Sequence, residues 1–376
     1  MPKHPGVKLI ISEDLKRVSY LYFLNKFLII FLIWLARDVL SPILPAAVDG
    51  LHQNVILDSL IHWDAGWFLR IAGQGYDFDC APFFPMFPFL IRTLTLLTGD
   101  NVISGFIISN AALFAACYFL YRMVRDDKNE EIATTTIFIM LFFPTAIFFT
   151  SIYSESLLLA FVLGSFYYAR QGKFTIAVAL AVLATLTRNL GVVMFFALLY
   201  HIYKTNGGRF DLKKTALLFV IPASLLIFMA VLWHTTGDPM AFASSLNREY
   251  WGFRHFEYPG AGQLLNLSLF FYNNEFYSLF ESGMAFLFLF LILNSYKYVQ
   301  DKAFMIFLVL GFLIPFSTVV DNLPLGMPRY IIVLFPGYIA LACMLHKHNL
   351  VHIYSIITVF VFSTITVLFA VGRWIS

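Results

Sequence analysis

Apolar runs long enough to cross a membrane recur from about residue 20 to the last residues of the chain. A helix needs roughly 20 apolar residues to span the hydrocarbon core of a bilayer. The chain is 60% hydrophobic and only 12% charged, whereas soluble domains carry about 25% charged residues. We therefore expect one integral membrane domain over residues 1–376, all-α and polytopic. The net charge of +3 and the absence of a long basic run argue against nucleic-acid binding.

The apolar runs predict about eleven spans, so the two termini are expected on opposite faces of the bilayer. All lysines fall on the amino-terminal side of this arrangement, and the opposite side holds arginines without lysine. Because cytoplasmic loops carry the lysine and arginine excess, we expect the lysine-rich side to be cytoplasmic. The expected spans are 20–42, 101–122, 132–152, 155–170, 174–187, 190–203, 215–236, 279–296, 303–320, 330–346 and 351–372.

Two long external loops are expected at residues 43–100 and 237–278, both rich in aromatic residues. Within the first loop, residues 83–97 are apolar but contain two prolines and an arginine. If they crossed, every later basic loop would change sides, so we expect them to be interfacial or re-entrant. The spans 174–187 and 190–203 are short, and half-helices meeting at residues 187–189 are an alternative to full crossings.

The sequence His62-Trp63-Asp64 is the most distinctive local feature of the first loop. As one continuous helix, this region places Asp64 in the middle of an apolar stripe. A carboxylate in apolar surroundings is costly unless it is paired or has a task, which favours a general base. Alternatively, the helix breaks at Trp63 and Asp64 caps a second helix that begins at Ala65. The stripe consists of Leu57, Leu60, Ile61, Trp67, Phe68 and Ile71.

Three further charged residues lie at expected span ends on the external side. Glu155 either has a functional role or, with Ser154, opens the fourth span and complements its helix dipole. Arg188, beside Asn189, lies between apolar flanks, where an ionisable group is a functional hypothesis by default. Arg329 is either an interface anchor or a group that holds a phosphate through two hydrogen bonds.

The sequence predicts neither a metal site nor a cofactor. The histidines are dispersed and the chain has no CxxC pair. The single HxxxH pair, His348 and His352, is expected near a cytoplasmic turn. It also lacks the glycine-rich GxxxxGK[ST] and GxGxxG motifs that bind nucleotides. If the protein transfers a group, we therefore expect its donor to arrive through the lipid.

Four strings taken in order resemble the PIG-V family of mannosyltransferases, which add the second mannose in GPI-anchor assembly and have many prokaryotic relatives. Together they cover about residues 62–337. The strings are HWDAGWFLRIAGQGYD, FFPMFPFLIR, FFPTAIFFTSIYSESLLLAFVLGSFYYARQGK with LATLTRNLG, and GMPRYIIVLFPG.

The resemblance implies a GT-C glycosyltransferase, a polytopic helical bundle with its active site facing away from the cytoplasm. It implies a polyprenyl-phosphate sugar as donor and Asp64 as the catalytic acid/base residue. His62 stands where many relatives have arginine. The chain is short and has no lysine-rich retrieval tail, which favours a prokaryotic plasma membrane, or the ER membrane in a eukaryote. The acceptor, a glycan, a lipid or a protein, is not specified.

On this hypothesis Asp64 accepts the proton of the acceptor hydroxyl, and arginines hold the donor phosphate. Rival interpretations are a transporter or flippase of lipid-linked sugars and a noncatalytic subunit. The expected phosphate-binding residues are Arg329, Arg188 and Arg70, and the expected substrate-binding residues are His62, Trp63, Trp67, Tyr76, Glu155, Asn189 and Tyr330.

Overall fold

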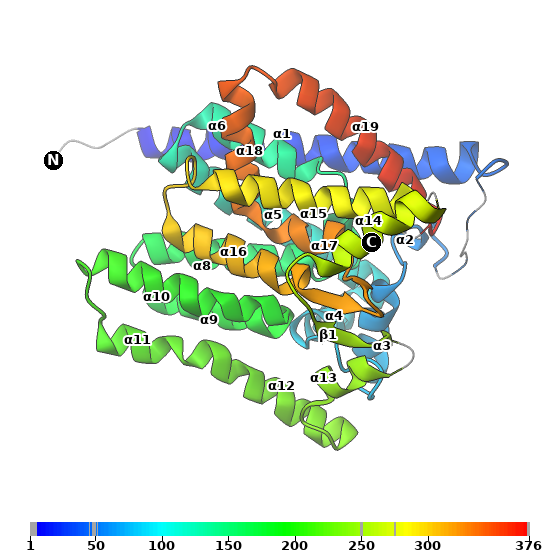
Figure 1. Ribbon diagram of the computed structural model, residues 1–376, viewed down its shortest axis with the longest axis horizontal. Coiled ribbons are helices and arrows are strands. Elements are labelled where there is room, and N and C mark those ends of the chain that lie inside the picture. The colour runs from blue at the N-terminus through cyan, green and yellow to red at the C-terminus, as the bar shows by residue number, and fades with distance from the viewer. Residues whose placement is uncertain are drawn as a thin grey trace.

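The fold is a bundle of helices in which the connections gather mainly towards two ends (Figure 1). The computed structural model describes residues 6–44, 46, 50, 52–248, 251–273 and 276–373. The helices of the first half are α1 (Gly6–Trp34), its π-helical continuation η1 (Leu35–Val39), α2 (Val55–Asp58), α3 (Asp64–Gln74), α4 (Met86–Thr98), α5 (Asn101–Asp127), α6 (Glu130–Leu141), α7 (Ile147–Thr150), α8 (Glu155–Arg170) and α9 (Phe174–Thr187).

The second half adds further helices and a small sheet. The helices are η2 (Asn189–Val193), α10 (Met194–Thr205), α11 (Leu212–Leu218), α12 (Val220–Thr236), α13 (Ala241–Ser244), η3 (Ser245–Asn247), α14 (Ala261–Asn273), α15 (Phe276–Ser295), α16 (Lys302–Phe316), α17 (Met327–Tyr330), η5 (Ile331–Val333), α18 (Phe335–Lys347) and α19 (Val351–Ala370). The strands are β1 (Arg254–Phe256), β2 (Thr318–Val320) and β3 (Leu323–Pro324).

Short polar side chains determine where several of these helices begin. Asp100 accepts hydrogen bonds from the backbone N–H groups of Val102 and Ile103 at the start of α5. Asn129 and Asp301 do the same at the starts of α6 and α16. Such caps satisfy donors that have no partner within the helix. Each capping residue lies within three positions of an apolar run, so these helix starts follow from the local sequence.

The helical membrane fold expected from the sequence is confirmed, and every expected span overlaps a helix. Among the described residues, five helices are long and apolar enough to cross a membrane: Glu13–Val39, Asn101–Asp127, Leu212–Thr236, Tyr277–Ser295 and Val351–Ala370. The other expected spans are covered by shorter or broken helices, so the count of eleven stays a prediction.

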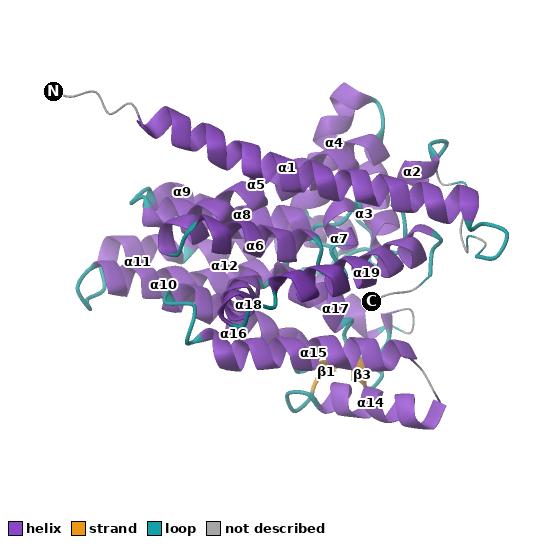
Figure 2. Ribbon diagram, turned by 90° about the horizontal axis from the view of Figure 1, so that it is seen from above, coloured by secondary structure: helices purple, strands orange, loops and turns teal. Residues whose placement is uncertain are grey.

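The expected tenth span is not one straight helix. The segments Met327–Val333 and Phe335–Lys347 meet at an angle of 83°, and α18 lies across the direction of α15 and α16 (Figures 1 and 2). Pro336 occupies the first turn of α18. A proline lacks the N–H that a continuous helix would need there, and its ring clashes with the preceding turn. The chain therefore bends at Leu334.

The two ends of the bundle differ in charge. The α10–α11 and α15–α16 connections lie towards one end, and α2, α3, α4 and the strands lie towards the other (Figure 1). The former end carries most of the lysines. Lys26 departs from this pattern because it lies within α1, where its Nζ donates to Thr150 Oγ1 at 2.5 Å. Which of the two ends faces the cytoplasm stays a prediction.

The first external loop contains a helix break that contradicts the continuous apolar stripe. α2 ends at Asp58, and α3 begins at Asp64 after Trp63 adopts φ 47°. The alternative of a break at Trp63 is therefore the correct one, with α3 beginning at Asp64 itself. The stripe does not reveal the break because its members are buried or half-buried on both sides of it. Residues 83–97 largely form α4, whose 13 residues reach only about 20 Å, too short for a full crossing.

The short spans around Arg188 are two helices that meet at a sharp reversal. α9 ends at Thr187, Arg188 is extended, and the 3-10 helix η2 leads into α10. Gly191 packs its backbone directly on the last turns of α9, where an added Cβ would lie 2.2 Å from the backbone nitrogen of Thr185. Only glycine fits this approach, so Gly191 is what allows the chain to double back at Arg188.

The second external loop contributes one strand to a small antiparallel sheet, which the sequence does not predict. β1 pairs with β2, and β2 pairs with β3. Asp321 and Asn322 adopt positive φ values of 49° and 68° in the turn between β2 and β3. The sheet connects residues 254–256 of this loop to the segment that leads into α17. Residues 249–250 and 274–275 of the loop lie outside the described residues.

The arrangement predicts that Asn206 and Tyr258 face opposite sides of the membrane. Both are exposed, Asn206 between α10 and α11 and Tyr258 in the second external loop. In a background with Cys80, Cys117 and Cys343 replaced by alanine, Asn206→Cys and Tyr258→Cys are expected to react with a membrane-impermeant thiol reagent from opposite faces. Labelling of both from the same face in sealed vesicles would contradict the arrangement.

Candidate active site

Four charged side chains form a continuous chain of ion pairs towards the end of the bundle that holds α3. Arg329 Nη1 donates to Asp64 Oδ2 at 2.5 Å, and Arg329 Nε donates to Glu155 Oε1 at 2.6 Å. Arg188 Nη1 donates to the same Glu155 oxygen at 2.7 Å and to Ser154 Oγ at 3.3 Å. We call Asp64, Arg329, Glu155 and Arg188 the ion-pair chain. The four residues that the sequence singled out separately are thus brought together.

Asp64 is positioned by the unusual backbone before it. Trp63 adopts φ 47° and ψ −109° at the N-terminus of α3, a conformation that bulky residues rarely adopt. The Tyr153 hydroxyl donates to the carbonyl oxygen of His62 at 2.8 Å. The rings of His62 and Trp63 each lie 5.3 Å from the ring of Phe369. These contacts hold the strained turn, which directs the Asp64 carboxylate towards Arg329.

Glu155 is the first residue of α8, but it is more than a capping neighbour. Ser154 makes no side-chain cap to the helix, and the Glu155 side chain is only 2% exposed and faces both arginines. Its position at a helix N-terminus also favours a negative charge. Ser156 Oγ donates to the carbonyl oxygen of Phe149 at 2.7 Å and fixes the turn that enters α8. Glu155 is therefore the buried centre of the ion-pair chain.

The two arginines reach Glu155 from different parts of the fold. Arg188 extends from the reversal between α9 and η2, and its guanidinium lies 5.2 Å from the centre of the Tyr330 ring. Arg329 lies on α17, with its guanidinium 4.5 Å from the centre of the Tyr153 ring. The Thr145 hydroxyl donates to the carbonyl oxygen preceding Arg329, that of Pro328, at 2.6 Å. Stacking on aromatic rings restricts both guanidinium groups to defined orientations.

The charges of the ion-pair chain cancel, and its members differ in exposure. Side-chain exposure is 21% for Asp64, 10% for Arg329, 2% for Glu155 and 16% for Arg188. An uncompensated charge at this depth would be costly, whereas two carboxylates and two guanidinium groups compensate one another. Asp64 is the more accessible carboxylate, so it is the one that can meet a reactant.

Other residues expected in the site lie apart from the ion-pair chain. Arg70 pairs with Asp77 and lies 5.3 Å from the centre of the Trp67 ring. Trp67 in turn packs against Phe83 and Trp251, with ring centres 6.0 and 5.4 Å apart. The Trp251 indole also donates to the carbonyl oxygen of Asp79 at 3.0 Å. These contacts join the two external loops to each other.

Three further residues expected to bind substrate are Tyr76, Asn189 and Tyr330, and two of them make contacts within the protein. The Tyr76 hydroxyl donates to the carbonyl oxygen of Phe83 at 2.7 Å. Asn189 begins η2 next to Arg188, and Tyr330 lies beneath the Arg188 guanidinium. Tyr153 and Ser154, which contact the ion-pair chain, were not among the expected site residues. They adjoin Glu155 in the string SIYSES, and this adjacency was the available signal.

Burial and hydrogen bonding shift the pKa values of two groups in the first external loop. Burial acts to raise the pKa of Asp77, but hydrogen bonds from Cys80 and Asp79 and the positive charge of Arg70 hold it below its usual value. Burial raises the pKa of the Cys80 thiol to about 11. The thiol is therefore protonated at neutral pH and is a poor nucleophile. The Asp77 carboxylate instead organises its own turn.

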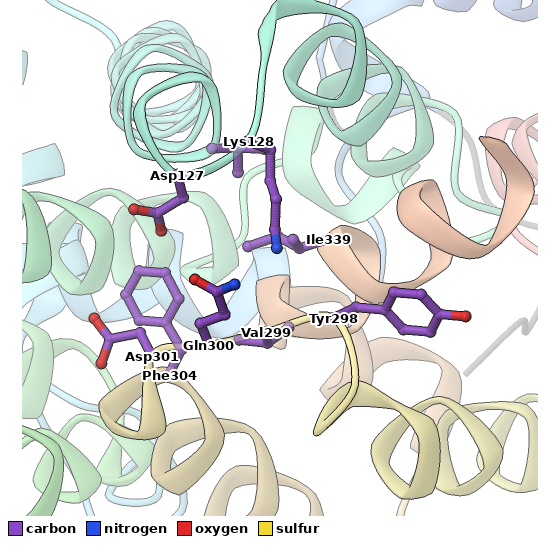
Figure 3. Close-up of a pocket in the computed structure, with 9 residues that line it drawn as sticks. Asp127, Lys128, Tyr298, Val299, Gln300, Asp301, Phe304 and Ile339 are labelled. Atoms are coloured by element: carbon purple, nitrogen blue, oxygen red, sulfur yellow. The ribbon is translucent and has the colours of Figure 1, made fainter. Parts of the chain in front are cut away.

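A pocket at the other end of the bundle is separate from this site. It has an empty volume of about 280 Å³ and is lined by residues that include Asp127, Lys128, Gln300 and Asp301 (Figure 3). Arg170 donates to Asp127 at 2.9 Å and to Asp301 at 2.8 Å. These ion pairs connect the ends of α5, α8 and α16, so we assign this network a structural role. Among the described residues, no group of three His, Cys, Asp or Glu side chains could hold a metal ion.

Comparison with known proteins connects this chain to a family of glycosyltransferases. The sequence pattern of the family described as Mannosyltransferase (PIG-V) matches residues 32–233, more than half of the chain. A protein named GPI mannosyltransferase 2 from Schizosaccharomyces pombe is 28% identical over 174 residues. That alignment covers 45% of this chain and 37% of the yeast protein. The family match includes Asp64, Glu155 and Arg188, while Arg329 lies beyond it.

Among solved structures, similarity is found to the oligosaccharyltransferase of Archaeoglobus fulgidus. Its crystal structure in complex with Zn and sulfate has a TM-score of 0.47 at 11% identity, covering 93% of this chain and 53% of that chain. Its complex with an inhibitory peptide and a dolichol-phosphate has a TM-score of 0.46 at 12% identity, covering 94% and 56%. The chain thus spans about half the length of these proteins.

The geometry predicts that Glu155→Gln destabilises the protein more than Glu257→Gln does. The Glu155 substitution leaves the buried Arg329 and the half-buried Arg188 short of one negative charge, and breaking a buried pair costs about 3–5 kcal/mol. Glu257 is a matched control because its side chain is 43% exposed. Thermal unfolding in detergent should show a clearly lower midpoint for Glu155→Gln only. Equal midpoints would mean that the ion-pair chain contributes nothing to stability.

Proposed function

This chain belongs to the mannosyltransferase (PIG-V) family, and on that premise we propose that it transfers mannose from a polyprenyl-phosphate donor to a lipid-linked or cell-surface acceptor. The observation that carries the proposal is the partly exposed Asp64 carboxylate, held by Arg329 at the end of the bundle away from the basic connections. This location supports transfer at the non-cytoplasmic face of the membrane.

In the proposed reaction, Asp64 removes the proton from the acceptor hydroxyl while that oxygen attacks the anomeric carbon of the donor. The new bond joins the acceptor oxygen to the anomeric carbon. The bond that breaks joins the anomeric carbon to a phosphate oxygen, which leaves with the electron pair. Attack opposite to the leaving group inverts the anomeric configuration. Asp64 then returns its proton to solvent before the next turnover.

The ion-pair chain suits the charge changes of this reaction. As Asp64 becomes protonated, the ion-pair chain loses one negative charge and becomes net positive. At the same time the departing polyprenyl phosphate gains one negative charge. Arg329 and Arg188 are then able to stabilise the phosphate, because guanidinium groups bind phosphate oxygens through two hydrogen bonds. The net positive charge of the ion-pair chain therefore develops at the same step as the negative charge on the departing phosphate.

The donor and acceptor belong on different sides of Asp64 in this proposal. Arg188 and Tyr330 lie at the end of the ion-pair chain opposite to Asp64, which suits the donor phosphate. Trp63 and the first external loop adjoin Asp64, which suits the acceptor sugar. The name of the yeast relative supports a glycolipid acceptor. Family membership favours transfer over the rival interpretation of a flippase.

We predict that Asp64→Asn abolishes most turnover, because an amide cannot accept the proton. Loss of a general base lowers rates by about 10²–10⁴-fold. The matched control is Asp79→Asn, a carboxylate of the same loop that is 49% exposed. The assay incubates purified protein with labelled polyprenyl-phosphate mannose and extracted acceptor lipids. Near-normal turnover by a folded Asp64→Asn variant would overturn the central assignment.

We also predict that Arg329→Lys lowers kcat by at least about tenfold. A lysine carries the charge but cannot bond Asp64 and Glu155 through two separate nitrogens. Lys128→Arg, in the pocket at the opposite end of the bundle, is the control and should retain wild-type kcat. If Arg329→Lys matched the control, the planar guanidinium would have no role in the transfer.

A further inference from the structure

We propose that Glu281 is a positioning residue that holds the α17 turn so that Arg329 can bridge Asp64 and Glu155. This inference deepens the proposed function and rests on it. Glu281 lies on α15, outside the ion-pair chain, and is 6% exposed. A buried carboxylate at membrane depth needs either a partner or a task. Its partners identify the task.

The carboxylate of Glu281 caps the short helix that carries Arg329. Its Oε1 accepts a hydrogen bond from the backbone N–H of Met327 at 3.2 Å. Met327 is the first residue of α17, and Gly326 before it adopts a left-handed conformation with no side-chain cap of its own. The first N–H groups of a helix have no partner within it. Glu281 therefore supplies from a neighbouring helix the acceptor that α17 lacks locally.

The second oxygen of Glu281 connects α17 to the second external loop. Asn266 Nδ2, on α14, donates to Glu281 Oε2 at 3.2 Å and to Ser282 Oγ at 3.3 Å. The Ser282 hydroxyl donates to the carbonyl oxygen of Gln263 at 3.1 Å. The Glu281 carboxylate thus accepts a hydrogen bond from α14 through one oxygen and from the start of α17 through the other. Both oxygens are used, and each has a hydrogen-bond donor.

This positioning role requires a side chain long enough to contact the Met327 N–H, and it does not require a negative charge. The hydrogen bonds that Glu281 accepts from Met327 and Asn266 come from neutral donors. In the part of the chain that the structure describes, no lysine or arginine forms a salt bridge with it. Only Pro328 separates Met327 from Arg329, so a shift at the start of α17 moves the guanidinium. Misplacement of a catalytic group by about 1 Å can lower a rate by as much as 10²-fold.

Two conservative substitutions distinguish the effect of side-chain length from the effect of charge. Glu281→Gln keeps the length and an oxygen for Met327, and the Asn266 amide can turn to accept from the new NH2 group. Glu281→Asp keeps the charge but withdraws the carboxylate by about 1.5 Å. We expect Glu281→Gln to stay within about threefold of wild-type kcat, and Glu281→Asp to lose about tenfold or more. The KM for the acceptor should not change in either variant. The reverse order would overturn the proposal, because it would show that the charge matters.

A second measurement does not depend on transferase activity. The shift in thermal midpoint caused by Arg329→Gln is determined in the wild-type background and in the Glu281→Asp background. If Glu281 positions Arg329, part of the Arg329 contribution is already lost in the Glu281→Asp protein, so the second shift should be less than about half of the first. Equal shifts would show that the two residues act independently and would overturn the proposal, whether or not the wild-type protein transfers mannose.

The matched control is Ser282→Ala, a neutral change beside Glu281 on the same helix. It removes a buried hydroxyl without touching the Met327 contact. It should leave kcat and the Arg329→Gln midpoint shift unchanged. If Ser282→Ala lowered kcat as much as Glu281→Asp does, general loosening of the α14–α15 hairpin would explain the effect and the positioning role would be wrong.

Discussion

The site depends on the mutual compensation of four charges in surroundings that are poorly hydrated. Asp64, Arg329, Glu155 and Arg188 lie in four different segments, and the closest contact between Asp64 and Arg329 joins residues 265 positions apart. None of the buried members could remain ionised alone at this depth without a large free-energy cost. The first external loop, the start of α8, the reversal after α9 and the α17 turn must therefore meet for the fold to be stable. This constraint makes the folded core and the site inseparable.

Each member of the ion-pair chain lies at an interruption of helical structure. Asp64 follows the strained Trp63, Glu155 begins α8, Arg188 is extended between two helices, and Arg329 lies on a helix of four residues before an 83° bend. Within a membrane, non-helical backbone is tolerated where it is buried in protein or lines a cavity. Helix ends also allow side chains to point along the bundle, so charges from several segments can converge at one depth. The interruptions are therefore the means by which the site is assembled.

The sequence predicts the helices and the charged residues well, but it offers the breaks at Trp63 and Arg188 only as alternatives. Hydropathy identified the membrane helices because burial in lipid determines composition along each run. Scarcity of charge identified the four members of the ion-pair chain. Periodicity missed the break at Trp63 because it records which residues are buried, not where the backbone turns. The role of Glu281 depends on a contact between segments that are far apart in the sequence, and a single sequence does not show which segments come into contact.

The need for two carboxylates follows from the chemistry proposed for one of them. When Asp64 accepts a proton, its attraction for Arg329 weakens at the step at which the guanidinium has to be in place for the leaving phosphate. Glu155, at 2% exposure, is shielded from the reactants and keeps its hydrogen bonds to both Arg329 and Arg188. It therefore holds the two guanidinium groups in place while Asp64 changes charge. A site with Asp64 alone would lose the position of Arg329 during the reaction, so the buried carboxylate is as necessary to the geometry as the exposed one is to proton transfer.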